Sequence, residues 1–150
     1  MKNTVKFLGV LVVLTAMALT ACGGKTAGSA ADLEGTKWTL LSYGTPDSPQ
    51  VLVDDTEITL EFDVAGGQIS GSAGCNRYFG EIEIKGDKLS VGVVGSTEMY
   101  CMEPEGVMEQ EKAYTSVLTL AESYQVQDEQ LRITCADGQV LVFNAAASGR

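Results

Sequence analysis

The sequence contains no histidine, so it lacks the side chain that most often serves as a general base or a metal ligand. It also contains no GxSxG motif, no P-loop and no dinucleotide-binding fingerprint. These absences leave no recognisable catalytic constellation. We therefore expect a protein that is not an enzyme, with no cofactor and no metal site.

Basic residues are scarce, because ten Lys and Arg stand against twenty Asp and Glu and give a formal charge of −10. A surface of this sign repels nucleic acid and anionic lipid headgroups, so we expect no nucleic-acid partner. A basic partner is electrostatically favoured, although acidity in many proteins serves only solubility.

Long apolar runs are missing except near the N-terminus, where residues 7–19 follow Lys2 and Lys6. This run is too short for a standard membrane span and indicates an export signal. The small residues that follow end in Leu-Thr-Ala-Cys22, which resembles the bacterial lipobox. The resemblance predicts a signal peptide at 1–21 and a diacylglyceryl group on the Cys22 sulfur. The alternative is an ordinary signal peptide and a free Cys22 thiol.

The lipid would anchor the chain at the cell membrane or the outer membrane, facing outside the cytoplasm. Gly and small polar residues then predict a flexible linker at 22–32. A single domain is expected at 33–144, followed by a tail at 145–150. Since Lys2 and Lys6 leave with the signal peptide, the mature chain of 129 residues has a formal charge near −12.

Alternating apolar residues predict a mostly β domain of the α+β class. In the strand expected at 36–43, Trp38 and Leu40 face the core, although Trp38 could instead stack on a ligand. Residues 44–55 are expected to form a loop. In the strand at 57–63, Ile58, Leu60 and Phe62 point inward. The other expected strands are 68–73, 78–85, 88–94, 96–101, 123–127, 130–135 and 139–144.

One helix is predicted from Pro104 to about Glu122, with Val107, Met108, Tyr114, Val117, Leu118 and Ala121 on its apolar face. Glu109, Gln110 and Lys112 are expected mostly on the opposite face. Glu111 lies close to the apolar face, so we expect it to be half-buried beside a partner such as Arg77.

Three cysteines remain if Cys22 carries a lipid, and an exported domain can keep a disulfide. Cys75 and Cys101 flank turns at the two ends of one hairpin segment, so we expect them to pair. A loop of 25 intervening residues would make this bond worth roughly 3 kcal/mol. Cys135 alternates with Leu131 and Ile133, which predicts a buried free thiol.

Other cysteine and carboxylate chemistry is weakly supported. A three-cysteine metal site would have wide spacing and no CxxC, and a cysteine nucleophile would lack a histidine to activate it. Glu81 and Glu83 face the same way along a strand, but in so acidic a chain a solvated face is the simpler interpretation. Asp54, Asp55 and Glu57 lack an EF-hand pattern around them.

Three ordered blocks of residues resemble the META domain, also called the HslJ-like family. The first block contains Gly74, Cys75, Asn76 and Tyr78; the second contains Thr97, Met99 and Cys101; the third contains Met108, Glu109 and Glu111. Residues 33–38 and 138–143 fit as well, so the resemblance covers 33–144. It implies an antiparallel, partly open half-barrel packed against one helix, and a disulfide between Cys75 and Cys101.

Members of this family are often secreted or lipid-anchored and have been linked to heat shock, novobiocin resistance and virulence. The resemblance implies no reaction, and it assigns no role to Cys135. We therefore expect a membrane-anchored, non-enzymatic lipoprotein that acts in envelope stress tolerance or binds an apolar ligand or a protein partner. The alternative is a secreted-type inhibitor of a cationic lysozyme or protease, which an acidic surface would suit.

Overall fold

The computed structural model describes residues 28–146. The predicted signal peptide at 1–21, the lipidation site Cys22, most of the predicted linker and residues 147–150 lie outside this range. The described chain begins with a short helix, α1 (Ala30–Leu33), so the last residues of the predicted linker are helical. Ser29 and Asp32 form a capping box there, with the Ser29 N–H donating to Asp32 Oδ2 at 2.7 Å.

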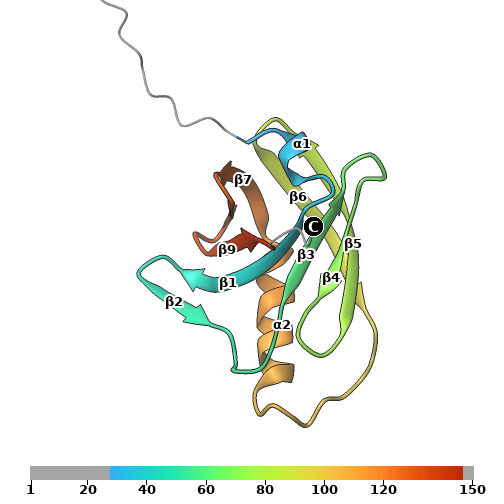
Figure 1. The fold of residues 1–150 in the computed structure, drawn as a ribbon, viewed down its shortest axis with the longest axis vertical. Helices are drawn as coiled ribbons and strands as arrows, with labels where there is room; N and C mark the ends of the chain where they lie inside the picture. The colour runs from blue at the N-terminus through green and yellow to red at the C-terminus, as the bar shows by residue number, and fades with distance from the viewer. Residues whose placement is uncertain (1–27, 147–150) are drawn as a thin grey trace, which may run out of the picture.

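The domain is a barrel of eight antiparallel strands (Figure 1). In spatial order these are β1 (Lys37–Thr45), β3 (Thr59–Asp63), β4 (Gln68–Ser72), β5 (Arg77–Lys85), β6 (Lys88–Ser96), β7 (Ala121–Gln127), β8 (Gln130–Cys135) and β9 (Val140–Ala145). The mostly β fold is thus confirmed. The open half-barrel is wrong, because β9 returns to β1 and pairs with it from Trp38–Ala145 to Gly44–Val140.

Within the ring of strands, β6 and β7 share the fewest paired residues. These strands share one residue pair, Lys88–Ser123, supported by the Tyr124 N–H, which donates to the Asp87 carbonyl at 2.9 Å. All other neighbouring strands of the ring share at least three residue pairs. The barrel is therefore closed, with a weak seam along β6.

Two helices lie at opposite ends of the barrel, with α1 at one end and α2 (Val107–Leu118) at the other (Figure 1). α2 packs against β1 and β9. No helix between residues 28 and 146 is long and apolar enough to cross a membrane.

Inward-facing side chains fill the barrel, as the alternation predicted. Trp38 and Leu40 are 2% and 3% exposed, and Ile58, Leu60 and Phe62 are also buried. The burial of Trp38 rules against its use as a ligand-stacking platform. Its indole N–H is the only buried side-chain polar group without a hydrogen-bond partner among the described residues.

Two strand predictions differ from the structure. Residues 44–55 are not only a loop, because β2 (Ser48–Val51) folds back on β1 as a hairpin outside the ring. Residues 97–101 do not form a strand. The Thr97 N–H still donates to the Arg77 carbonyl of β5, but the Thr97 hydroxyl and the Met99 N–H bond to the Asn76 side chain.

The helix is shorter than predicted. Gly106 occupies the N-cap position with φ +88°, so α2 begins at Val107 and not at Pro104. At the other end, Ala121 already pairs with Cys135, so Ala121 and Glu122 belong to β7. Tertiary pairing overrides the local helical pattern at this end.

Gly71 in β4 supplies a test of the barrel packing. A Cβ at this position would collide with the Thr59 carbonyl oxygen and lie 2.9 Å from the Tyr78 ring. We expect Gly71→Ala to lower the free energy of unfolding by about 2 kcal/mol or more, measured by urea denaturation. Gly92→Ala in β6 is the matched control, because the nearest atom lies at 3.5 Å and the change should stay below about 1 kcal/mol. Equal stability of the two variants would contradict this packing.

Candidate functional site

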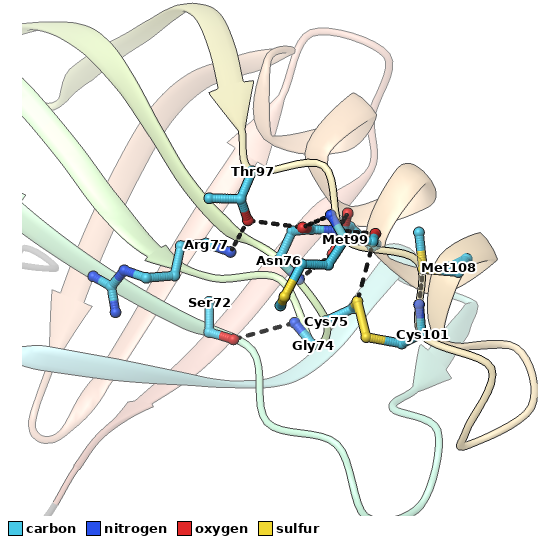
Figure 2. Close-up of a disulfide and its surroundings, with 10 residues drawn as sticks. Ser72, Gly74, Cys75, Asn76, Arg77, Thr97, Met99, Cys101 and Met108 are labelled. Carbon is cyan, nitrogen blue, oxygen red and sulfur yellow. Dashed lines mark hydrogen bonds between the residues drawn. A yellow bond between two sulfur atoms is a disulfide. The ribbon is translucent and has the colours of Figure 1, made fainter.

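The three sequence blocks of the motif meet in space (Figure 2). Gly74, Cys75 and Asn76 form the connection from β4 to β5. Residues 97–101 follow β6, and Glu111 comes from α2. Residues far apart in the sequence thus form one cluster, which we call the Asn76 cluster: Gly74, Cys75, Asn76, Thr97, Met99, Cys101 and Glu111.

Asn76 is the centre of this cluster and is 2% exposed. Its Nδ2 donates to the Met99 carbonyl at 3.0 Å and to Glu111 Oε1 at 2.8 Å. Its Oδ1 accepts from the Met99 N–H at 2.8 Å and from the Thr97 hydroxyl at 2.7 Å. The side-chain amide therefore uses both donors and both acceptor sites, so it is fully satisfied.

Glu111 is buried, and both of its carboxylate oxygens bond to Asn76. Oε2 accepts from the Asn76 backbone N–H at 2.7 Å, and Oε1 accepts from the side-chain amide. The predicted partner Arg77 is wrong. Arg77 is exposed and its side chain extends away from Asn76 (Figure 2), because alternate residues of β5 face opposite sides.

The disulfide between Cys75 and Cys101 is present, with 6.0 Å between the Cα atoms, as predicted. The Cys101 N–H lies 3.5 Å from Met108 Sδ and donates to it, so the sulfur of Met108 also contacts this segment. Residues 97–101 are therefore held in two ways, covalently at Cys101 and by hydrogen bonds at Thr97 and Met99.

Tyr78 extends the motif into the barrel. Its hydroxyl donates to the Thr59 carbonyl at 2.8 Å and lies 2.7 Å from the Tyr114 hydroxyl. The two rings meet edge to face, with 5.6 Å between their centroids. Burial raises the pKa of both tyrosines well above the ordinary value, so both hydroxyls stay neutral and serve packing.

The remaining motif residues have structural or exposed positions. Gly74 has φ +111°, and a Cβ there would lie 3.2 Å from Val107 Cγ2, so the turn requires glycine. Met99 bonds through its backbone while its side chain is exposed. Glu109 is exposed in the first turn of α2, without a hydrogen-bonded side chain among the described contacts.

Gln110 is a structural residue that the sequence reasoning placed on the wrong face of the helix. It is 3% exposed, accepts from the Val53 N–H at 2.6 Å and donates to the Thr56 hydroxyl at 3.0 Å. It thereby fixes the connection from β2 to β3 to the helix. Its spacing of three residues from Val107 and four from Tyr114 is the signal that could have identified it.

Cys135 is buried and unpaired, as predicted, with its thiol 3.4 Å from the Val117 carbonyl. Burial, and next the nearby Asp137, raise the pKa of this thiol to about 11. The thiolate needed for nucleophilic or metal chemistry is thus disfavoured at neutral pH. Glu83 pairs with Lys85 and Glu57 with Lys37, both on the surface. Residues 28–146 contain no group of three or more His, Cys, Asp or Glu side chains that could hold a metal ion.

An apolar surface lies outside the motif, on the outer wall of β4, β5 and β6. Phe79 is 62% exposed and Val93 is 91% exposed. They line a hollow of about 560 Å³ together with Gln68, Gly80 and Glu81. The Phe79 ring lies across Gly95, where an added Cβ would come within 2.9 Å of two ring atoms. We call this surface the Phe79 wall. The sequence reasoning missed it, although Phe79 alternates with the buried Tyr78.

The partner of Glu111 can be tested by substitution. Asn76→Ala keeps the backbone N–H bond to Glu111 Oε2 but leaves Glu111 Oε1 and the Met99 N–H without partners, so we expect a loss of roughly 3 kcal/mol in the free energy of unfolding. Arg77→Ala, one residue away, should change it by less than about 0.5 kcal/mol. Urea denaturation of the oxidised variants measures both. A larger loss of stability for Arg77→Ala than for Asn76→Ala would show that Arg77 is the partner of Glu111.

Comparison with known proteins places this fold among solved structures. An NMR structure of a protein from Burkholderia xenovorans superposes with a TM-score of 0.68 and 28% identity, over 91% of this chain and 100% of that chain. A second NMR structure has a TM-score of 0.58 and 22% identity, over 78% and 94%. A crystal structure of a DUF4847 family protein from Bacteroides vulgatus ATCC 8482 has a TM-score of 0.55 and 11% identity, over 77% and 96%. The last two likenesses show the fold alone.

No curated protein matches the chain. The META domain family matches residues 31–148, which include the barrel, α2, all of α1 except Ala30, and every residue of the Asn76 cluster. The chain therefore belongs to the META domain family.

Proposed function

We propose that this META domain is a non-enzymatic binding module that is anchored to a membrane by a lipid on Cys22. The observation that carries the proposal is the Phe79 wall, where an aromatic and an aliphatic side chain are exposed beside a hollow of about 560 Å³. Exposed apolar patches of this kind mark interaction sites in soluble domains.

The rest of the described domain supports binding on the outside of the barrel. The interior is filled by buried side chains, and the polar groups at the centre of the Asn76 cluster are hydrogen-bonded to one another. The only free thiol among the described residues is buried and has a raised pKa. What the domain offers to a partner is thus an external surface and not an internal pocket.

The acidic residues beside the wall favour a basic partner. Glu81 lines the hollow of the Phe79 wall, and an adjoining hollow of about 270 Å³ has Glu61, Asp63 and Phe79 in its lining. With a formal charge of −10, the chain would attract a basic protein at long range. The same acidic residues support a second candidate function, the inhibition of a cationic lysozyme or protease. The family resemblance supports a role in envelope stress tolerance for either form.

The proposal can be tested in the native cells by fractionation combined with chemical crosslinking. We expect the wild-type chain in the membrane fraction and Cys22→Ala in the soluble extract. The double variant Phe79→Ser, Val93→Ser should stay in the membrane fraction but lose at least about tenfold of the crosslinked partner, since both changes remove apolar contact area. Val51→Ser, at an exposed valine of β2, is the matched control and should keep the crosslink.

Each half of the proposal has its own contradicting result. Retention of Cys22→Ala in the membrane fraction would exclude the lipid anchor. An unchanged crosslink in the double variant, or an equal loss in Val51→Ser, would exclude the Phe79 wall as the binding surface.

A further inference from the structure

The seam between β6 and β7 leaves a strand edge without a partner strand. β6 pairs with β5 along its length, from Tyr78–Ser96 to Lys85–Lys88, but with β7 only at Lys88. In an antiparallel sheet, alternate backbone groups of a strand point to each side. Within residues 28–146, the β7 side of residues 89–96 therefore has backbone groups that no strand pairs. Ser90, Gly92, Val93 and Ser96 are exposed, so this edge is open to a partner.

The inner face of the barrel is incompletely covered at the same seam. Ile82 and Ile84 of β5 and Val91 and Val94 of β6 face the core but are only partly buried. Equivalent inward residues elsewhere, such as Leu60 and Ile133, are fully buried. An added strand beside β6 would cover this apolar surface and fill the gap between β6 and β7 in the barrel.

The fold has a second free strand edge, at β2, and that edge is protected against pairing with another chain. β2 is four residues long and contains Pro49, which cannot donate a ladder hydrogen bond. Proline and short length are common protections of an edge strand against pairing with other chains. Residues 89–96 contain neither a proline nor a charge. A β-bulge places Gly92 and Val93 of β6 opposite the single β5 residue Glu81, but neither proline nor charge blocks pairing along this stretch. This edge is therefore less protected than that of β2, as expected of an edge that a partner covers.

Charge selects the kind of partner. Glu81 lines the hollow beside Val93, and Glu98 follows the end of β6. A second copy of this acidic chain would be repelled, whereas a basic segment would be attracted. Backbone groups in a row are recognised by another extended backbone, since strand addition satisfies them pairwise.

We infer that β6 binds an extended segment of a basic protein by strand addition at the seam. The segment pairs its backbone with residues 89–96. Its inward-facing apolar side chains contact Val91 and Val94, which face the core on either side of the bulge, and its Lys or Arg side chains face the Glu81 side. This inference rests on the proposed function and specifies both the partner chemistry and the binding mode.

The test uses the purified full chain and two synthetic probes, a nine-residue peptide of alternating Val and Lys and its Val and Glu counterpart. NMR-detected hydrogen exchange is measured for the backbone amides of residues 89–96. We expect the Val/Lys peptide to slow exchange of the fast-exchanging amides in this stretch by at least about tenfold, in a salt-sensitive manner. The Val/Glu peptide should leave their exchange unchanged.

Two exposed valines provide the matched variants. Val93→Lys adds a charge to the β6 edge and should abolish the effect of the Val/Lys peptide, while the unfolding midpoint stays unchanged. Val51→Lys makes the same change on the β2 edge and should leave the peptide effect intact.

Three results would overturn the inference. Equal protection of residues 89–96 from exchange by both peptides would show that charge does not select the partner. Protection that rises with protein concentration alone would assign the edge to a second copy. Resonance shifts confined to Phe79 and Glu81, without protection of residues 89–96, would show docking on the wall without strand addition. In that last case the proposed function stands, whereas it fails separately if the double variant at Phe79 and Val93 keeps its cellular crosslink.

Discussion

The pair of hydrogen bonds between Asn76 and the Glu111 carboxylate is the interaction on which the motif depends. A buried carboxylate usually needs a cation, and its desolvation costs several kcal/mol if it is unpaired. Here Asn76 donates to both carboxylate oxygens, through its backbone N–H at 2.7 Å and its side-chain amide at 2.8 Å. The same amide holds Thr97 and Met99, so one asparagine joins α2, the start of β5 and the segment after β6.

This arrangement explains why the motif is structural while the surface that we propose for binding lies elsewhere. The cluster fixes where β6 ends, and the disulfide fixes the same segment a second time at Cys101. β6 is thereby held on its β5 side and at its end, yet it meets β7 at one residue pair. A firmly held strand with an open edge and an adjacent apolar wall is well suited to binding, because little conformational entropy remains to be lost.

Much of the barrel could be predicted from local patterns. Strict alternation identified Ile58, Leu60 and Phe62 as core, and the same reasoning placed Cys135 inside. Closure of the barrel could not be predicted in this way, because β1 and β9 pair across the whole length of the domain. Polarity alone misplaces Gln110 and Arg77, because helical spacing and strand alternation decide which side each residue faces. The Phe79 wall was missed because alternation indicates which side chains point outward but not which of them adjoin a hollow.

Amide hydrogen exchange after reduction of the disulfide tests most directly whether the hydrogen bonds of Asn76 hold this segment. The probes are the backbone N–H of Asn76, which bonds to Glu111, and that of Met99, which bonds to the Asn76 side chain. We predict that both amides remain protected under native conditions after reduction, slowed by about a hundredfold or more relative to an unfolded chain. Exchange of both at the unfolded rate, while the core strands stay protected, would show that the disulfide and not Asn76 holds the segment.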